Sequence, residues 1–65
     1  MLRWNDAQAI AEELYDANPG LDPVTLRLTE LHAMVTALED FGDDPDKSNE
    51  ALLEAILQAW IDEYA

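Results

Sequence analysis

The 65-residue sequence contains no cysteine, one histidine and only three basic residues. Without cysteine, the chain cannot form disulfides, hold zinc or iron–sulfur clusters through thiolates, or accept a persulfide. No apolar run approaches the roughly 18 consecutive residues of a membrane span. The N-terminal stretch MLRWNDAQ also lacks the apolar region of a secretion signal. These absences together predict a cytoplasmic protein that does not enter membranes.

The shortage of basic residues leaves the chain strongly acidic. Fifteen carboxylates against three cations give a net charge of −12. Such a field repels nucleic acids and anionic membranes and attracts cations or a basic protein surface. The stretch TELHAMVTALED, where a DNA-recognition helix would lie in a helix-turn-helix fold, offers no basic residue for phosphate contacts. The sequence therefore predicts a positively charged partner and no nucleic-acid binding.

The apolar content nevertheless indicates a folded protein. Hydrophobic residues make up 49% of the chain, too many for a disordered acidic tail. A domain of this size buries only about 60% of its unfolded surface and has no room for a deep substrate cavity. We therefore expect a single domain over residues 1–65 that acts through its surface.

The spacing of apolar residues predicts a small, mainly all-α fold with three helices. The first helix is expected over residues 5–17, with a capping box formed by Asn5 and Gln8 and an end at the sequence NPG. The pair Asp22-Pro23 then predicts a short helical turn through Leu26. A brief alternation of apolar and polar residues over 25–28 allows one minimal extended segment. The buried stripe of the first helix comprises Ala7, Ile10, Ala11 and Leu14.

The second and third helices carry their own start and stop signals. Thr29 can cap the second helix, and Gly42 marks its expected end. Two signals compete for the start of the third helix, Asp44-Pro45 and Ser48, and we favour Ser48. The third helix has the widest apolar stripe, formed by Leu52, Leu53, Ile56, Leu57, Trp60, Ile61 and Tyr64.

Several single residues are expected to be structural. The two tryptophans and the two tyrosines are assigned to the core, with the alternative that a partly exposed Tyr15 joins a partner surface. His32 is expected to form a hydrogen bond at the edge of the core, because no second histidine or cysteine can complete a soft-metal or nucleophilic site. Arg27 is expected to pair with Asp22 or Glu30. No set of nucleophile, base and orienting residue can be assembled, so we predict that the protein is not an enzyme.

The most acidic segment, EDFGDDPDKSNE at residues 39–50, invites a calcium-loop interpretation. Asp44, Asp46 and Ser48 match the first ligand positions of an EF-hand, but Asn49 stands where glycine is required and Ala55 where a bidentate glutamate is required. An EF-hand is therefore excluded. Hard oxygen donors suited to iron, magnesium, manganese or calcium remain, without a spacing that dictates geometry.

A second acidic surface is expected on the first helix. Asp6, Glu13 and Asp16 fall close to one another on the helical wheel, with Glu12 beside them, opposite the stripe of Ile10 and Leu14. Glu12 and Asp16 are like charges at positions i and i+4, which costs an isolated helix a few tenths of a kcal/mol. Their presence hints at selection for something other than stability.

The chain resembles the IscX family, small acidic proteins of the bacterial isc system for iron–sulfur cluster assembly. The resemblance covers nearly the whole chain in a fixed order of short motifs. These are W-x-D from Trp4, LYDANP from Leu14, LDP from Leu21, RLTELH from Arg27, LEDFGDDP from Leu38, SNEALLEAI from Ser48 and WIDE from Trp60.

The resemblance implies a winged-helix-like domain that binds iron, as Fe²⁺ or Fe³⁺, weakly through surface carboxylates. It also implies an adaptor, regulator or iron donor that binds the cysteine desulfurase IscS, at a basic surface shared with the bacterial frataxin. We expect the protein to be a monomer. The expected partner-binding residues are Asp6, Glu12, Glu13, Asp16, Asp22, Glu39, Asp40, Asp43 and Asp44. The expected iron ligands are Asp22, Glu39, Asp40, Asp43 and Asp44.

Two other functional classes compete with a desulfurase regulator. One is an acidic mimic of DNA, or another interaction module with a helix-turn-helix-like fold, and the other is a hydrolase. A partner or turnover assay separates these classes. We further expect asparagine at positions 40, 43 and 44 to relieve repulsion and keep or raise stability, and Ser48→Ala to cost about 1 kcal/mol as a lost helix cap.

Overall fold

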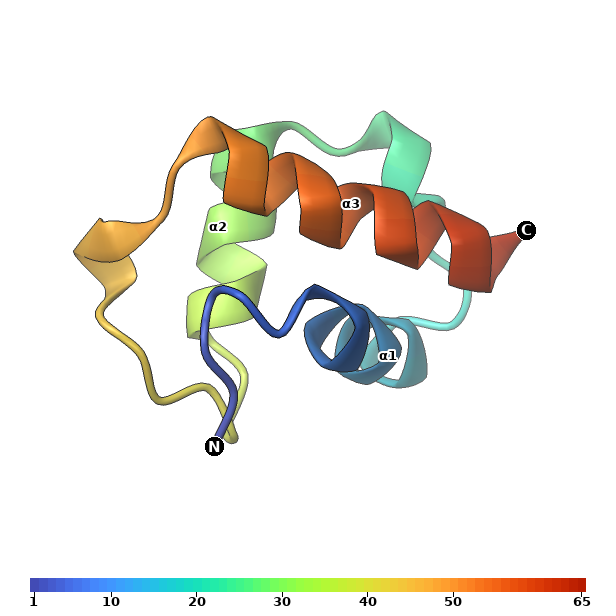
Figure 1. Cartoon of the computed structure of the whole chain (residues 1–65). Coiled ribbons are helices and arrows are strands. Elements are labelled where there is room, and N and C mark those ends of the chain that lie inside the picture. The colour runs from blue at the N-terminus through green and yellow to red at the C-terminus, as the bar shows by residue number, and fades with distance from the viewer.

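The computed structural model describes residues 1–65 and consists of three α-helices joined by loops and two short 3₁₀ turns. The helices are α1 (Ala7–Ala17), α2 (Leu28–Thr36) and α3 (Glu50–Tyr64), and the turns are η1 (Pro23–Thr25) and η2 (Pro45–Lys47). In Figure 1, α3 lies across the molecule, with α1 below it and α2 behind. The expected small all-α domain is confirmed.

The N-terminal residues of α1 differ from the expectation. The helix begins at Ala7. The preceding Asp6 carboxylate caps no helical N–H and instead accepts a hydrogen bond from the Arg3 backbone N–H at 2.9 Å. Gln8 donates its side-chain amide to Glu63 at 2.7 Å. The predicted capping box of Asn5 and Gln8 is therefore wrong, since Gln8 instead links α1 to the end of α3.

The end of α1 and the following turn agree with the sequence prediction. The Asn18 side chain donates to the Leu14 carbonyl at 3.1 Å and closes the last turn of α1. Asp22 accepts the Val24 backbone N–H at 3.0 Å, and Pro23 occupies the first position of η1. Proline suits this position because the missing N–H would have no helical acceptor there.

Helix α2 is shorter than expected and starts differently. Arg27 precedes it, and the Glu30 carboxylate accepts the Arg27 backbone N–H at 3.0 Å. Thr29 lies inside the first turn and is not the cap. The helix ends at Thr36, well before Gly42, so the interpretation of Gly42 as a helix-end signal is wrong. Gly42 also lacks the positive φ that such a signal requires.

Gly42 instead allows the N-terminal segment to approach the loop that follows α2. Its backbone N–H donates to the Leu2 carbonyl at 2.9 Å, and the Leu2 N–H donates to the Asp40 backbone carbonyl at 2.7 Å. A Cβ at this position would overlap the Met1 side chain. The only β contact of the chain is the parallel bridge between Leu2 and Phe41. The minimal extended segment allowed near residues 25–28 is present at Leu26 and Arg27, which have extended backbone angles but form no β-bridge. A winged-helix arrangement is not confirmed.

Of the two competing start signals ahead of α3, only Asp44-Pro45 starts a helical element, and that element is η2 and not α3. Asp44 caps η2 by accepting the Asp46 backbone N–H at 2.9 Å. Asn49 then caps α3 by accepting the Leu52 N–H at 2.9 Å. Ser48 lies between the two in extended conformation and caps neither. The predicted cap is therefore one residue too early.

The core lies where the three helices meet. Its fully buried side chains include Ile10 and Leu14 from α1, Leu31 and Val35 from α2, and Trp60 from α3. α3 packs most extensively against α1 and also contacts α2 and η1, which explains its wide apolar stripe. The Trp60 indole N–H is buried without an acceptor.

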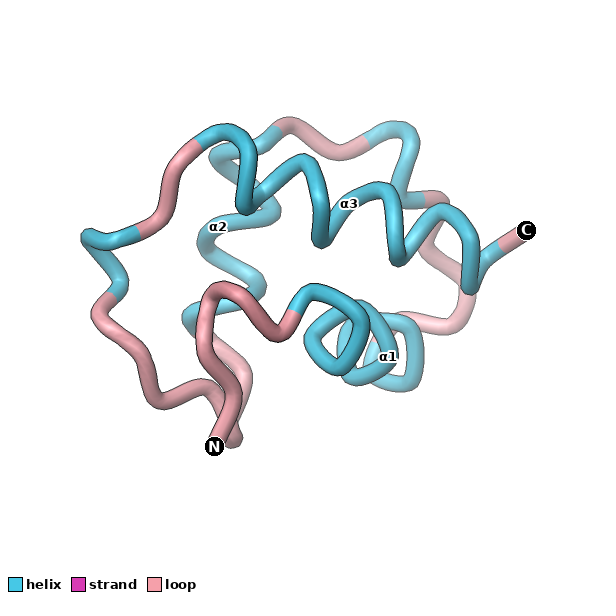
Figure 2. Tube along the Cα trace, viewed as in Figure 1, coloured by secondary structure: helices cyan, strands magenta, loops and turns pink.

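The aromatic residues divide between core and surface. Trp4 is 2% exposed, so the core assignment of both tryptophans is confirmed. Tyr15 is partly buried against the core, whereas Tyr64 is 41% exposed at the end of α3. The core assignment of Tyr64 is therefore wrong, because the last turn of α3 extends past the other two helices (Figure 2).

Candidate interaction surface

Trp4 organises the acidic loop between α2 and α3. Its backbone N–H donates to the Asp43 carboxylate at 3.1 Å, and its indole N–H donates to the Asp44 carbonyl at 2.7 Å. The ring lies edge-on to Phe41 with 4.8 Å between centroids. The N-terminal segment and the loop therefore hold each other in place.

The Asp43 carboxylate is occupied on both oxygens. Oδ2 accepts the Trp4 N–H, and Oδ1 accepts the Asp44 N–H at 2.8 Å. The hydrogen bond from Trp4 has the largest effect and lowers the pKa of Asp43 below its ordinary value of 3.8, and the bond from Asp44 lowers it further. The charges of Arg3 and Lys47 have smaller effects in the same direction. Hydrogen bonds to the ionised form favour it. Asp43 is thus a carboxylate whose negative charge supports the local fold.

His32 also belongs to this arrangement. Its ring stacks on Trp4 with 5.3 Å between centroids and an interplanar angle of 25°. The Nε2 atom lies 2.7 Å from the Pro45 carbonyl oxygen, at hydrogen-bond distance. Because a carbonyl oxygen only accepts, Nε2 is the donor, and this bond connects α2 to η2. The expected structural role of His32, hydrogen-bonded at the edge of the core, is confirmed.

Four of the nine predicted partner-binding residues accept local backbone hydrogen bonds. Besides Asp43, they are Asp6, Asp22 and Asp44, each bonded to an N–H two or three residues away. Their charges remain available to a partner, but their orientations are set by the turns they stabilise. This overturns the premise that asparagine at 43 and 44 would only relieve repulsion.

The side chains of the other five predicted residues accept no hydrogen bond within the chain, and only one of them forms an ion pair. Glu12, Glu13 and Asp16 on α1 and Glu39 after α2 are exposed and form no hydrogen bond or ion pair within the chain. Asp40 lies 3.7 Å from the N-terminal amino group, in an exposed pair. Exposed ion pairs of this kind contribute at most about 1 kcal/mol.

The basic residues do not neutralise these carboxylates. The contact of Asp40 with the N-terminal amino group is the only ion pair in the structure. Arg27 pairs with neither Asp22 nor Glu30, so that expectation is wrong; Glu30 bonds the Arg27 backbone instead. Apart from Asp40, no carboxylate of this chain, whose net charge is −12, is therefore paired with a cation.

The predicted iron ligands do not converge on one preformed site. No group of three or more histidine or acidic side chains is arranged to hold a metal ion. Asp22 precedes η1, toward the C-terminal end of α3, whereas residues 39–44 lie in the loop beyond its N-terminal end (Figure 1). The donor chemistry suits iron, but the arrangement offers no ready geometry.

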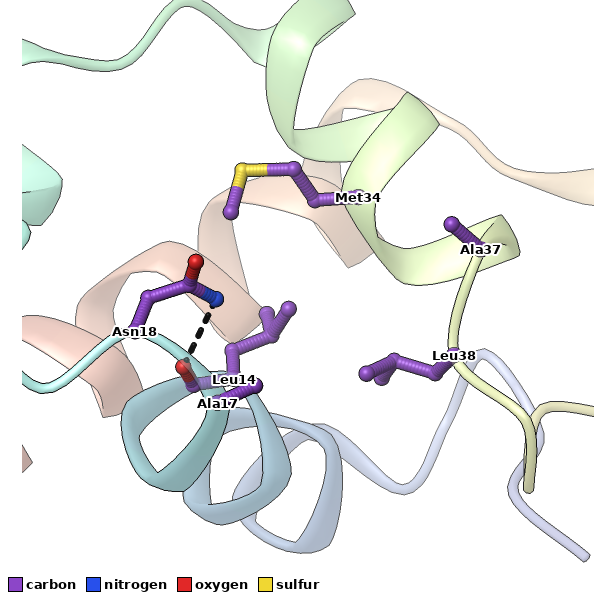
Figure 3. Close-up of a pocket in the computed structure, with 6 residues that line it drawn as sticks. All are labelled: Leu14, Ala17, Asn18, Met34, Ala37 and Leu38. Carbon is purple, nitrogen blue, oxygen red and sulfur yellow. Dashed lines mark hydrogen bonds between the residues drawn. The ribbon is translucent and has the colours of Figure 1, made fainter.

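Two open apolar grooves were not anticipated from the sequence. One, of about 300 Å³, is lined by Leu28, Thr29, His32 and Leu53. The other, of about 240 Å³, lies between the end of α1 and the end of α2. Figure 3 shows its lining residues: Leu14, Ala17, Asn18, Met34, Ala37 and Leu38. The sequence signal was slight, because small residues at two helix ends reveal a groove only once the helices are placed side by side.

The fold and the surface together define a small, acidic, all-α domain with unpaired carboxylates and no membrane-spanning helix. The chain belongs to the iron-sulphur cluster assembly family, the IscX family indicated by the motifs, whose model matches residues 2–65. It is also 42% identical over 62 residues to an uncharacterized protein of Pseudomonas aeruginosa, covering 95% of this chain and 94% of the relative. The domain therefore has a role in iron–sulfur cluster assembly.

Proposed function

We propose that this domain is a non-catalytic, monomeric accessory protein of the cytoplasm that binds the cysteine desulfurase IscS and weakly binds iron. The observation that carries the proposal is the set of exposed carboxylates without an intramolecular partner, Glu12, Glu13, Asp16 and Glu39. Family membership supplies the context of cluster assembly. These carboxylates would pair with lysine and arginine side chains on a basic surface of the desulfurase.

Electrostatics should govern how fast the complex forms. Opposite charges on the two proteins steer their encounter and raise the association rate, and salt screens this attraction over about 8 Å. The carboxylates of α1 are free to meet lysine or arginine because no group in the chain competes for them. Binding should therefore weaken as salt rises, mainly through slower association.

Iron is cargo or a signal for such a protein and not a resident cofactor. Glu39 and Asp40 offer exposed oxygens, whereas Asp43 already accepts two backbone N–H groups and Asp44 and Asp22 accept one each. Ligands that must give up these bonds and their water bind a cation weakly. Occupancy should thus be spread over several carboxylates, and asparagine at 43 and 44 should reduce it without abolishing it.

The decisive experiment is a titration of the purified domain with purified desulfurase, at low and high salt and with and without ferrous iron. A variant carrying Glu12→Gln, Glu13→Gln and Asp16→Asn should bind at least about tenfold more weakly, a change worth 1.4 kcal/mol. The matched control is Glu50→Gln, Glu54→Gln and Asp62→Asn on α3, which removes the same charge from other exposed sites.

Four results would contradict the proposal or a part of it. An affinity that does not change with salt would remove the electrostatic account, and equal losses in the two triple variants would show that only net charge matters. Turnover of a substrate by the isolated domain would contradict its non-catalytic assignment. Complete loss of iron on a single substitution would replace distributed binding by one defined site.

A further inference from the structure

The groove between α1 and α2 separates two acidic surfaces that looked unrelated in the sequence. Its α1 wall consists of Leu14, Ala17 and the neighbouring Asn18, and its α2 wall of Met34, Ala37 and Leu38 (Figure 3). Leu14 is buried, whereas Ala17 and Ala37 are exposed at the ends of their helices. The two helix ends therefore leave an open apolar depression between them.

The charged residues that neighbour the lining residues of this groove in the sequence all have the same sign. Glu13 and Asp16 adjoin lining residues of α1, and Glu39 directly follows the lining residue Leu38. All three are exposed and lack a hydrogen bond or ion pair within the chain. No basic residue lines the groove or adjoins a lining residue in the sequence.

The other groove lacks this pattern. Arg27 adjoins its lining residue Leu28 in the sequence, and Glu30 and Glu54 adjoin Thr29 and Leu53, so its lining residues have sequence neighbours of both signs. The groove between α1 and α2 is the smaller one, at about 240 Å³. Pockets for small ligands commonly have about 300–1,000 Å³. This groove suits a protein side chain better than a small molecule.

We infer that this groove anchors an apolar side chain carried by a basic segment of the desulfurase surface. The inference rests on the proposed function and names its contact site. Apolar side chains that fill a pocket supply much of the binding energy of an interface, and surrounding charges set its specificity and association rate. A basic segment with one central leucine or methionine would fill the apolar groove and complement the carboxylates that neighbour its lining residues in the chain.

The test blocks the groove without changing charge. Ala17→Gln and Ala37→Gln each place a longer polar side chain at an exposed helix end beside the groove. Both should weaken binding to purified desulfurase at least about tenfold, mainly through faster dissociation. The matched control, Ala55→Gln on the exposed side of α3, should stay within about twofold of wild type. Thermal melting verifies that all three variants remain folded.

A second measurement reports on the groove directly. Met34 lines it, so the NMR signal of its ε-methyl group should shift when desulfurase is added to the full chain. The same signal should not move when the domain alone is concentrated. A shift on concentration alone would assign the groove to a second copy of this chain and overturn the inference.

The outcomes separate this inference from the proposed function. If wild type binds desulfurase, but both groove variants bind equally well and the Met34 signal stays in place, the groove is not the anchor and electrostatic docking stands. If wild type does not bind desulfurase under any salt condition, the proposed function and this inference both fall.

Discussion

Asp43 and Asp16 are the same residue type in opposite situations. Asp43 accepts backbone N–H groups on both carboxylate oxygens, and its pKa is lowered mainly by the bond from Trp4. Asp16 lies on the exposed face of α1 and accepts nothing within the chain. Negative charge in this protein therefore has two uses. Carboxylates in the loop hold a turn together, and those on α1 are left for the surroundings.

The contrast also explains why the loop is acidic. Residues 38–49 contain no α-helix and must satisfy their backbone groups by other means. Carboxylates accept neighbouring N–H groups in the short turn at Asp44 and again at Asp43. Helix α1 satisfies its own backbone, so its carboxylates have no such task. Mutations in the two regions test this division, in order of decreasing effect.

Removal of Trp4 should cause the largest loss of stability. Trp4→Ala deletes a buried side chain that contacts the loop and α2, and should cost about 3–5 kcal/mol. Trp4→Phe keeps an aromatic ring but loses the indole hydrogen bond to Asp44, and should cost about 1 kcal/mol through that bond. Urea unfolding monitored by circular dichroism measures both. Equal losses for the two variants would show that the hydrogen bond, rather than the packing, holds the loop.

Neutralisation of Asp43 should cause a smaller loss. Asparagine offers one acceptor oxygen where the carboxylate offers two, so Asp43→Asn gives up one of the bonds to Trp4 and Asp44. The matched control is Asp46→Asn, which removes the same charge from the same loop but no side-chain hydrogen bond. The melting temperature should fall for the first variant and hold or rise for the second. If the melting temperature changed in the same direction in both variants, charge alone, and not the hydrogen bonds of Asp43, would determine how this loop affects stability.

The lowered pKa of Asp43 gives this contrast a dependence on pH. Its contribution to stability is present above the ordinary pKa of 3.8 and is lost as pH falls below it through the lower folded-state value. Asp43→Asn should therefore flatten the decline of stability in this acidic range. Unfolding measured between neutral pH and the acid limit checks the effect, and an unchanged decline would contradict it.

Loss of the Asn49 cap should cost about 1 kcal/mol, the usual value for an N-cap side chain. Asn49→Ala removes the acceptor of the Leu52 N–H without changing charge. Ser48→Ala should be close to neutral, because Ser48 caps neither η2 nor α3. This pair measures capping alone, apart from the charge effects at Asp43. A larger loss for Ser48→Ala in thermal melting would restore the cap position expected from the sequence.

Neutralisation of the α1 carboxylates should have the smallest effect on stability. Glu12→Gln relieves the repulsion between Glu12 and Asp16 and should stabilise the domain by about 0.2–0.5 kcal/mol. The triple variant with Glu13→Gln and Asp16→Asn should be at least as stable as wild type while it loses affinity for desulfurase. A destabilised triple variant would place these residues with Asp43 as structural carboxylates.

The helices and the core could be predicted from the sequence because their signals are local. Apolar residues three and four apart place Ile10, Leu14 and Trp60 on buried stripes, and Asp22-Pro23 marks η1 by its own chemistry. The charge of −12 and the missing cysteine likewise follow from composition. These properties alone indicate an acidic all-α domain that acts through its surface.

The tertiary structure decided which carboxylates are occupied and where the grooves lie. Asp43 and Trp4 are 39 positions apart, and their hydrogen bond forms where the N-terminal segment lies beside the loop, next to the bridge between Leu2 and Phe41. Gln8 meets Glu63 only after α1 has packed against α3. Leu14 and Leu38 line one groove because the ends of α1 and α2 face each other. Periodicity reports the buried face of each helix, but the partner of a side chain depends on how the helices are placed.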